Sequence, residues 1–497
     1  MVVTAMFQSV AALETTIMKK IKSQNNTTKV AIFAGAAALM ALTPQTHAQS
    51  SVDALLNKLE QKGILTVDEA KELKAENATN SVADFNKAMG AKFQMPDWVT
   101  SYKLYGDFRG RYEDMSTDIP AFASPGAGVP KGADNNMRMR YRLRVGLTID
   151  MKDNLQVGFR LGSADTSSVN STGGTLLSDS STFQGNGSKK FIFVDLAYGK
   201  WTPINNGTWM VAGTLGKMDV PFQESWMVFD PDYTPEGVAL QATYKIDDNH
   251  SLAFNGAGFV LDQTTSRGPF LYGGQIIWNA TWSPKISTSL GLADYDISDD
   301  ANFPPGTTVG FSTPYDSNLG NTIHPVTIPS FPATTTGYTF ANHFNPVVAS
   351  GSATYTFDSF PLYRGAFPVK FAGEYMNNPA AAHNNTGWWA GVTLGKSGKK
   401  GSWDISYRYQ RLEADAWWDQ IVDDDNIAVF PDTVNTPPSN KAVGGTNIKG
   451  HLIRFNYSIY DSLTFTFSAY INELINNPLP GTQTGAVHAM ADLIWKF

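Results

Sequence analysis

The sequence predicts an all-β fold: a 16-stranded antiparallel transmembrane β-barrel preceded by a short N-terminal periplasmic helical hairpin. Three observations lead to this prediction. From Tyr102 onwards, apolar and polar side chains alternate residue by residue, which is the period of a strand. The connections between these strands alternate between long and short. Finally, only 17% of the residues are charged and the mean hydropathy is -0.22, which suits a barrel because only every second side chain faces lipid.

Composition also excludes several function classes. The formal net charge is -7, so the chain lacks the excess of lysine and arginine that phosphate binding requires, and we expect no nucleic-acid partner. Cysteine is absent, and the seven histidines do not show the close spacing of a metal site. We therefore expect no metal and no cofactor.

The N-terminus predicts an exported protein. Lysines at positions 19, 20, 22 and 29 precede an apolar run from Val30 to Leu42, which is the length of a signal-peptide core and too short to span a bilayer as a helix. Small residues follow, and we expect cleavage after Ala48. Residues 1–48 are thus interpreted as a signal peptide, with Met18 as the expected true start.

The next segment, residues 49–96, predicts a periplasmic helical hairpin or coiled coil and a linker. Apolar residues recur at helical spacing from Val52 to Leu59, and Gly63 can end that helix. Thr66 to Glu69 has the pattern of a capping box that opens a second helix. The hairpin could stand in the periplasm, drive trimerisation, contact the cell wall or partly plug the barrel.

The barrel itself is predicted for residues 97–497. Its clearest strand runs from Met137 to Ile149, where apolar residues alternate with four arginines, a pattern that no helix sorts onto two faces. The sixteen expected strands cover 101–113, 136–150, 153–163, 191–201, 207–217, 237–247, 250–260, 269–283, 285–297, 345–358, 367–377, 386–396, 401–413, 446–459, 462–474 and 483–497. An even strand number with alternating long loops and short turns is typical of bacterial outer-membrane barrels.

The last strand adds an independent indication. Apolar residues from Val487 to Trp495 form one face, and the chain stops on Phe497. A terminal aromatic strand of this kind resembles the signal that the barrel-assembly machinery reads, so Phe497 is the expected membrane-assembly residue. Aromatic residues such as Trp201, Trp278 and Trp403 fall near expected strand ends, where they would form interfacial girdles.

Three stretches carry a family resemblance: Asp230 to Gly237, Gly401 to Tyr409, and Gly445 to His451. Together with the N-terminal hairpin they resemble the Putative porin family of Gram-negative bacteria. The resemblance covers essentially the whole chain after residue 48. It implies an outer-membrane diffusion channel for small hydrophilic solutes and ions, and a homotrimer.

A channel would act through fixed charges on its lumen wall. Arginine in mid-bilayer costs about 2–4 kcal/mol, so alternation directs seven arginines to the lumen, where we expect a net positive wall. The alternative is that local acids such as Asp107, Glu113 and Asp150 pair with several of them. The seven are Arg109, Arg111, Arg138, Arg140, Arg142, Arg144 and Arg160.

The third long loop, from about Met218 to Glu236, is the candidate constriction loop. Its acidic residues are Asp219, Glu224, Asp230, Asp232 and Glu236. Resemblance to general porins implies that it folds inward and sets acids against the arginines; the alternative is an ordinary external loop. Asp423 to Asp425 are interpreted as solvated loop charge, with divalent cations that bridge lipopolysaccharide as the alternative. The pairs Trp388–Trp389 and Trp417–Trp418 are interpreted as packing, girdle or loop-anchoring residues rather than sugar platforms.

Other functions are less favoured. No Gly-x-Ser-x-Gly elbow occurs and no histidine has a catalytic context, so we do not expect an enzyme. A substrate-specific channel for phosphate, another anion or an oligosaccharide is the principal alternative, followed by a structural or adhesive barrel. Expected partners are outer-membrane lipids, lipopolysaccharide and the barrel-assembly machinery.

Overall fold

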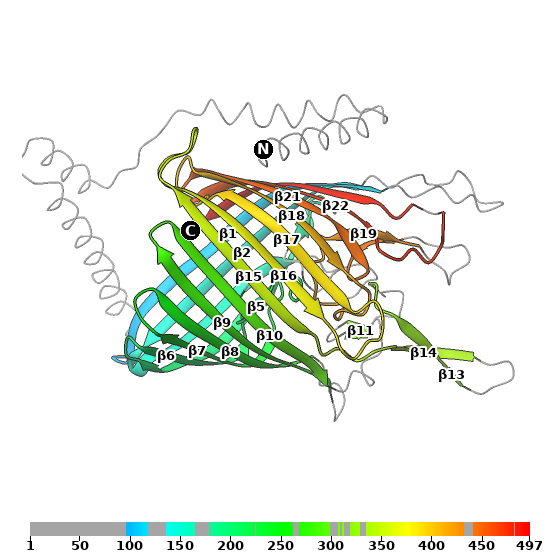
Figure 1. Cartoon of the computed structure of the whole chain (residues 1–497), viewed down its shortest axis with the longest axis horizontal. Coiled ribbons are helices and arrows are strands. Elements are labelled where there is room, and N and C mark those ends of the chain that lie inside the picture. Colours follow the sequence, from blue (N-terminus) through cyan, green and yellow to red (C-terminus); the bar gives the residue numbers. More distant parts are fainter. Residues whose placement is uncertain are drawn as a thin grey trace, which may run out of the picture. The chain divides into compact units, whose positions relative to one another are not determined.

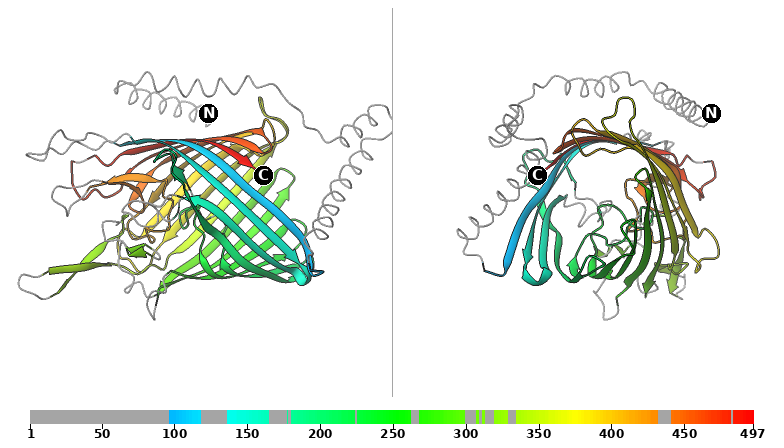
Figure 2. Two further views of the ribbon diagram at one scale, coloured as in Figure 1. Left: turned by 180° about the vertical axis from the view of Figure 1, so that it is seen from behind. Right: turned by 60° about the vertical axis from the view of Figure 1, so that its left-hand side comes forward.

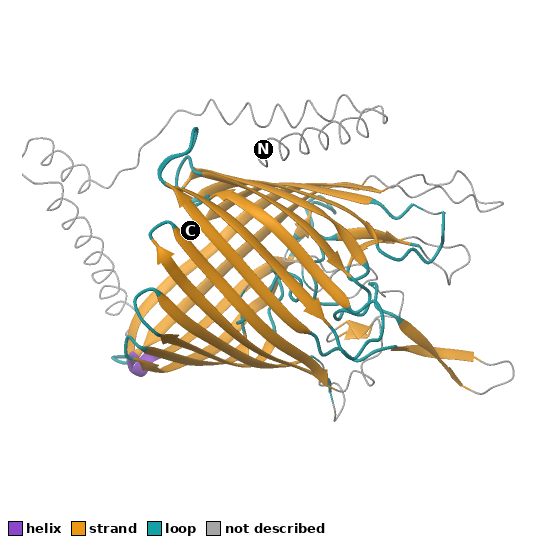
Figure 3. Ribbon diagram, viewed as in Figure 1, coloured by secondary structure: helices purple, strands orange, loops and turns teal. Residues whose placement is uncertain are grey.

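The computed structural model describes residues 96–117, 136–164, 177, 180–223, 225–261, 268–298, 307–308, 311–312, 319–328, 334–431, 441–481 and 483–497. The expected signal peptide and helical hairpin lie outside these residues. No helix among the described residues has the length and hydropathy needed to cross a membrane. One 3-10 turn, η2 (Lys152–Asn154), is the helix drawn in Figure 3.

Sixteen long strands form one closed antiparallel barrel (Figure 1), as the sequence predicted. They are β1 (Val99–Thr117), β2 (Asn136–Met151), β3 (Leu155–Ala164), β5 (Phe191–Asn205), β6 (Trp209–Lys217), β7 (Glu236–Lys245), β8 (His250–Val260), β9 (Phe270–Ser283), β10 (Ile286–Ser298), β15 (Val347–Phe357), β16 (Phe367–Asn377), β17 (Thr386–Gly395), β18 (Trp403–Leu412), β21 (Ile448–Tyr460), β22 (Leu463–Leu474) and β23 (Ala486–Lys496). Each overlaps one expected strand.

Short elements accompany the barrel. The two-residue strand β4 (Ser181–Thr182) pairs with β2 and is the seventeenth member of the sheet. Three separate hairpins are built into the long loops: β11 (Thr307–Thr308) with β12 (Phe311–Ser312), β13 (Ile323–Ile328) with β14 (Thr334–Phe340), and β19 (Ile427–Phe430) with β20 (Lys441–Gly444).

The barrel closes where β1 pairs with β23, from Asp107 opposite Lys496 to Thr117 opposite Ala486. Phe497 completes this seam, because Gly106 and Phe497 exchange two backbone hydrogen bonds of 2.9 and 3.1 Å. Its side chain is 58% exposed, so the ring is free to contact the surroundings of the barrel. The role of Phe497 in membrane assembly stays a prediction.

Local chemistry explains the short turns. Asp153 and Asn154 have φ of 61° and 58°, a left-handed conformation that Asp and Asn tolerate better than most residues. In the β7–β8 turn, Asp247 accepts backbone hydrogen bonds from Asn249 and His250, both 2.7 Å. The end of the barrel that carries these connections is called the short-turn end below, and the opposite end the long-loop end.

The two faces of each strand differ as the alternation predicted. On β2, Met137, Met139 and Leu143 are exposed on the outer face, whereas Arg142 on the opposite face is 7% exposed. The right-hand view of Figure 2 shows why the inner face is covered, since loop segments lie inside the ring of strands. The core of the protein is therefore in the lumen, between the inner wall and these loops.

Candidate functional site

The loop of residues 218–235, between β6 and β7, crosses the lumen. Gln241 on β7 donates to the Pro221 carbonyl at 3.2 Å. Gln275 on β9 accepts from the Gln223 amide and donates to the Gln223 carbonyl, at 2.9 and 2.7 Å. Anchors on several different strands hold the loop inside the barrel, which is the arrangement implied by the resemblance to general porins.

Glu374 on β16 holds the middle of this loop. Its two carboxylate oxygens accept the backbone N–H groups of Trp226 and Met227, at 3.1 and 3.2 Å. Glu374 is only 4% exposed, so these charge-assisted hydrogen bonds are shielded from water. Sequence analysis missed this residue, although alternation along β16 places it on the same face as Lys370 and Met376.

A second segment, residues 413–430, lies against the first loop. Trp417 donates its Nε1–H to the Val228 carbonyl at 2.9 Å, and the Asp230 amide donates to the Ile421 carbonyl at 2.7 Å. Trp417 and Trp418 are fully buried in the apolar cluster that joins the two segments, which confirms their interpretation as packing residues. The two loops thus form one packed body rather than two independent lids.

Inner-face acids pair with the arginines of β2. Glu113 on β1 is 0% exposed and accepts from Arg138 at 3.0 and 2.7 Å and from Arg140 at 3.5 Å. Asp107, six residues before Glu113 on β1, accepts from Arg142 and Arg144 at 3.0 and 2.7 Å. Local pairing therefore neutralises part of the wall, as the alternative interpretation of these arginines required.

Loop acids supply further partners. Asp232 in the 218–235 loop accepts from Arg142 at 3.0 Å. Asp425 lies 3.6 Å from Arg111, and Asp423 lies 3.6 Å from Arg408. The interpretation of Asp423 to Asp425 as solvated external charge is therefore wrong, because the 413–430 segment folds inward and brings these acids against the lumen wall.

The remaining predicted residues have separate surroundings. Arg160 pairs with Asp195 and with Asp219, which is 69% exposed, whereas Arg111 pairs with Asp492 on β23. Arg109 donates to Ser180 and has no carboxylate within 4.0 Å in the described part of the chain. Glu236 lies 3.5 Å from Lys217 at the loop's end, and Glu224 lies outside the described residues.

His488 on β23 is a further charged residue that sequence analysis did not single out. It is 2% exposed, with Nε2 2.8 Å from Glu113 and Nδ1 2.9 Å from the Asp425 carbonyl. The Asp425 carbonyl and the Glu113 carboxylate are both acceptors, and an imidazolium ring would satisfy the two at once. His488 thereby bridges the wall at Glu113 and the 413–430 segment.

Three carboxylates lie close together where the 218–235 loop meets the 413–430 segment, and they repel one another when ionised. Asp230, Asp423 and Asp424 offer carboxylate oxygens within 4.8 Å of one another. Burial raises the pKa of Asp230 well above its usual value, and the neighbouring acids Asp424 and Asp423 raise this pKa further. Asp230 still accepts the Asp424 and Asp232 amides, at 3.0 and 2.6 Å.

A pH dependence follows from this raised pKa. The stability that protonated Asp230 contributes is complete below about pH 4 and is lost as the pH rises through the folded-state pKa. We therefore expect the melting temperature of Asp230→Asn, relative to wild type, to rise from about pH 4 to neutral pH. A relative fall, reproduced by adding a chelator to wild type, would instead show that the three acids hold a cation.

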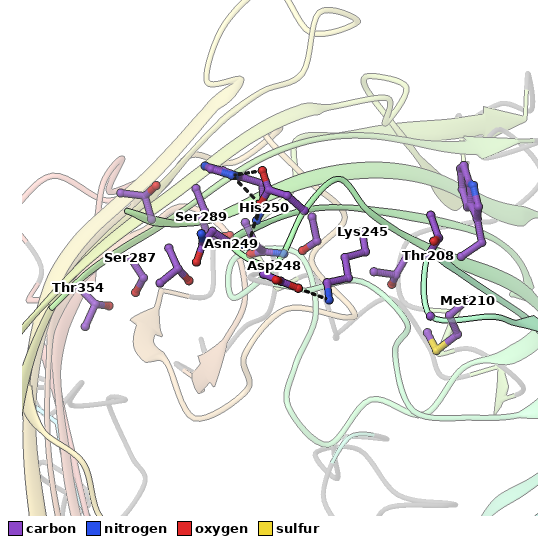
Figure 4. A pocket seen from close by; sticks show the side chains of 18 of the residues that line it. Thr208, Met210, Lys245, Asp248, Asn249, His250, Ser287, Ser289 and Thr354 are labelled. Atoms are coloured by element: carbon purple, nitrogen blue, oxygen red, sulfur yellow. Dashed lines mark hydrogen bonds and ion pairs between the residues drawn. The ribbon is translucent and has the colours of Figure 1, made fainter. Parts of the chain in front are cut away.

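Below the loops, the lumen widens into a polar vestibule at the short-turn end. The cavity measures about 660 Å³, and Figure 4 shows Ser287, Ser289 and Thr354 on one side and the Lys245 to His250 turn on another. Thr243 and Asn279 also line it, on the strand faces that carry Gln241 and Gln275. This side of the lumen is hydrophilic and carries lysines and aspartates, among them Lys245, Asp248 and Lys370, whereas arginine–carboxylate pairs dominate the β1–β2 side.

Comparisons with known proteins give one family and several solved structures. Residues 70–304 match the family described as "Putative porin". No curated protein matches the chain. Structural similarity extends to Pseudomonas putida OprB, with TM-score 0.46, 11% identity and coverage of 80% of this chain and 94% of that one. The outer membrane channel DcaP of Acinetobacter baumannii has TM-score 0.37, 11% identity and coverage of 80% and 97%.

Proposed function

We propose that this chain, whose residues 70–304 match the Putative porin family, forms a water-filled channel for passive diffusion of small hydrophilic solutes and ions across an outer membrane. The observation that carries this proposal is the narrowing of a closed barrel by its own loops. The 218–235 loop and the 413–430 segment are fixed inside the lumen, above a hydrophilic vestibule of about 660 Å³. Such an arrangement limits solute size without any chemical step.

Charge distribution supports weak ion selectivity. Arginines line one side of the lumen, and carboxylates from the wall and the loops lie directly against them. A solute that passes this side lies within one Debye length, about 8–10 Å, of both positive and negative charges. The fields of these charges therefore largely cancel along the path of the solute. What remains is a transverse field, which orients dipolar solutes more than it selects ions.

A second candidate is an anion-selective channel, and one observation favours it. Arg109 is 8% exposed, and among the described residues no carboxylate lies within 4.0 Å of its guanidinium. A buried wall cation without a contacting carboxylate adds a positive field to the lumen, and such a field favours anions over cations. An oligosaccharide channel gains less support, because Trp417 and Trp418 are buried and offer no stacking face.

Location and assembly belong to the same proposal. The protein is exported by its signal peptide, inserted by the barrel-assembly machinery and surrounded by lipopolysaccharide and phospholipid, with its short-turn end in the periplasm. We propose a homotrimer on the strength of the family resemblance. Crosslinking of the protein in intact outer membranes tests the trimer, and a single band at the size of one chain would contradict it.

The central experiment is planar-bilayer recording of the purified protein under a salt gradient. We expect discrete conductance steps with a small reversal potential, because most of the arginines on the lumen wall lie against carboxylates. Addition of inorganic phosphate and of maltooligosaccharides separates the candidates: block by phosphate supports the anion channel, and absence of block supports general diffusion. Folded protein without any steps would contradict both.

A further inference from the structure

The short-turn end carries an unusual surface on its outer face. The β15–β16 turn, residues 358–366, projects beyond the strands that it joins (Figure 1). At its tip, Leu362 is 96% exposed and has a φ of 65°, a conformation that a leucine adopts only when its surroundings impose it. A fully exposed leucine in a fixed turn is costly in water and favourable in an apolar medium.

An aromatic cluster fixes this turn against the outside of the barrel. Phe367 on β16 stacks with Phe360 at a ring-centroid distance of 4.1 Å and lies 5.8 Å from Trp403 on β18. Trp403 donates its Nε1–H to the Leu362 carbonyl at 2.9 Å, and the Tyr363 hydroxyl donates to the Lys396 carbonyl at 2.8 Å. Alternation places Phe367 and Trp403 on the outer face, opposite the inward Lys370 and Arg408.

Four cations surround this cluster. Arg364, Lys396, Lys399 and Lys400 are exposed, and within the described chain none has a carboxylate within 4.0 Å of its cationic nitrogen atoms. The three lysines lie in the β17–β18 turn, residues 396–402. This turn is adjacent to the β15–β16 turn, since the Arg364 guanidinium lies 4.0 Å from the point where a Gly401 side chain would begin. Lys400 lies over the Tyr460 ring at 5.1 Å.

Acids near these cations are engaged elsewhere. Asp461 accepts the Lys400 backbone amide at 2.6 Å, and Asp404 accepts the Ser397 amide at 2.9 Å. Two lysines in the other short turns have carboxylate partners, since Lys245 pairs with Asp248 at 2.7 Å and Lys285 with Asp358 at 2.5 Å. Lys152 in η2 is a single exposed lysine without a carboxylate within 4.0 Å among the described residues. Unpaired positive charge is therefore concentrated at the two turns that carry the aromatic cluster and Leu362.

We propose that this surface binds an anionic phospholipid of the periplasmic leaflet. The phosphate contacts Arg364, Lys396, Lys399 and Lys400, while Leu362 and the Phe360–Trp403 cluster contact the upper part of the acyl chains. Membrane interfaces favour aromatic rings at headgroup level, and clustered lysine and arginine beside them attract anionic lipid. The inference rests on the outer-membrane orientation proposed above.

Lipid retention tests the proposal. The purified full-length protein is delipidated in detergent, titrated with phosphatidylglycerol or phosphatidylcholine, and examined by native mass spectrometry. We expect preferential retention of phosphatidylglycerol, and a loss of roughly fivefold in affinity for each cation removed from Arg364→Gln/Lys396→Gln/Lys399→Gln/Lys400→Gln. The matched control Lys245→Gln removes a paired lysine from the same end of the barrel without touching the 358–366 turn, and should retain the lipid.

Other variants and readouts separate the outcomes. Leu362→Asp keeps all four cations and should weaken retention, because its charge replaces the apolar tip. The proposal would be overturned by equal retention of both lipids or by an equal loss of lipid in the control. It would also be overturned if inorganic phosphate, at the concentration of the lipid, displaced the lipid. Dissociation of an oligomer without loss of lipid would overturn it as well. Conductance of the same preparations keeps the two functions apart: a conducting protein without lipid preference refutes the lipid site alone, and a lipid-binding protein without conductance refutes the channel alone.

Discussion

Glu374→Ala is expected to raise the single-channel conductance severalfold. The substitution leaves the buried amide of Met227 and the partly buried amide of Trp226 without acceptors, and the buried one alone costs about 1–3 kcal/mol. Since 1.4 kcal/mol corresponds to a tenfold change in an equilibrium constant, the population with a detached loop should increase at least about tenfold. A detached loop no longer spans the lumen between β6 and β16, so the open cross-section grows.

Two further variants make this result specific. Glu374→Gln keeps one acceptor oxygen and should give an intermediate conductance. Glu473→Ala removes a mostly exposed glutamate that pairs with Lys449 on the neighbouring strand, and should leave the conductance unchanged. Far-UV circular dichroism checks that each barrel is folded. Wild-type conductance in folded Glu374→Ala would show that the loop stays in place without this carboxylate.

The barrel could be predicted from sequence because its determinants are local. The alternation of arginine and apolar residues along β2 fixes which side chain faces which side, and turn residues such as Asp153 and Asn154 mark where a strand ends. Bilayer physics then requires closure, since lipid cannot satisfy an open sheet edge. These rules need no knowledge of distant contacts.

The interior of the lumen could not be predicted in the same way. Glu374 lies 147 residues from Met227, and Asp230 lies 194 residues from Asp424, whose backbone amide it accepts. Such contacts depend on how two long loops pack together, and no periodic pattern encodes them. The same reason explains why the interpretation of Asp423 to Asp425 was wrong. An acidic run alone indicates solvated charge, and only the three-dimensional structure shows the arginines and the histidine that face it.

Substitutions of Arg142 and of Asp232 are expected to shift the ion selectivity of the channel in opposite directions. Asp232→Asn removes a negative charge from the loop and should move the reversal potential towards anions, because Arg142 then has only Asp107 as a partner. Arg142→Gln leaves Asp107 and Asp232 facing each other and should move the reversal potential in the direction of cation selectivity. The double variant removes one charge of each sign, so its reversal potential should lie close to wild type if the two contributions add; a departure from the sum of the two single shifts would measure the coupling between the residues.

Salt dependence separates this pair from distant charges. Both shifts should shrink as ionic strength rises, since the Debye length falls from about 10 Å at 0.1 M to about 3 Å at 1 M. Asp358→Asn, which removes an exposed acid paired with Lys285 at the short-turn end, serves as the control and should leave the reversal potential unchanged. Shifts of the same sign in both single variants would mean that they act by displacing the 218–235 loop. Unchanged reversal potentials would place the conducting path away from the β2 wall, along the strands that line the vestibule.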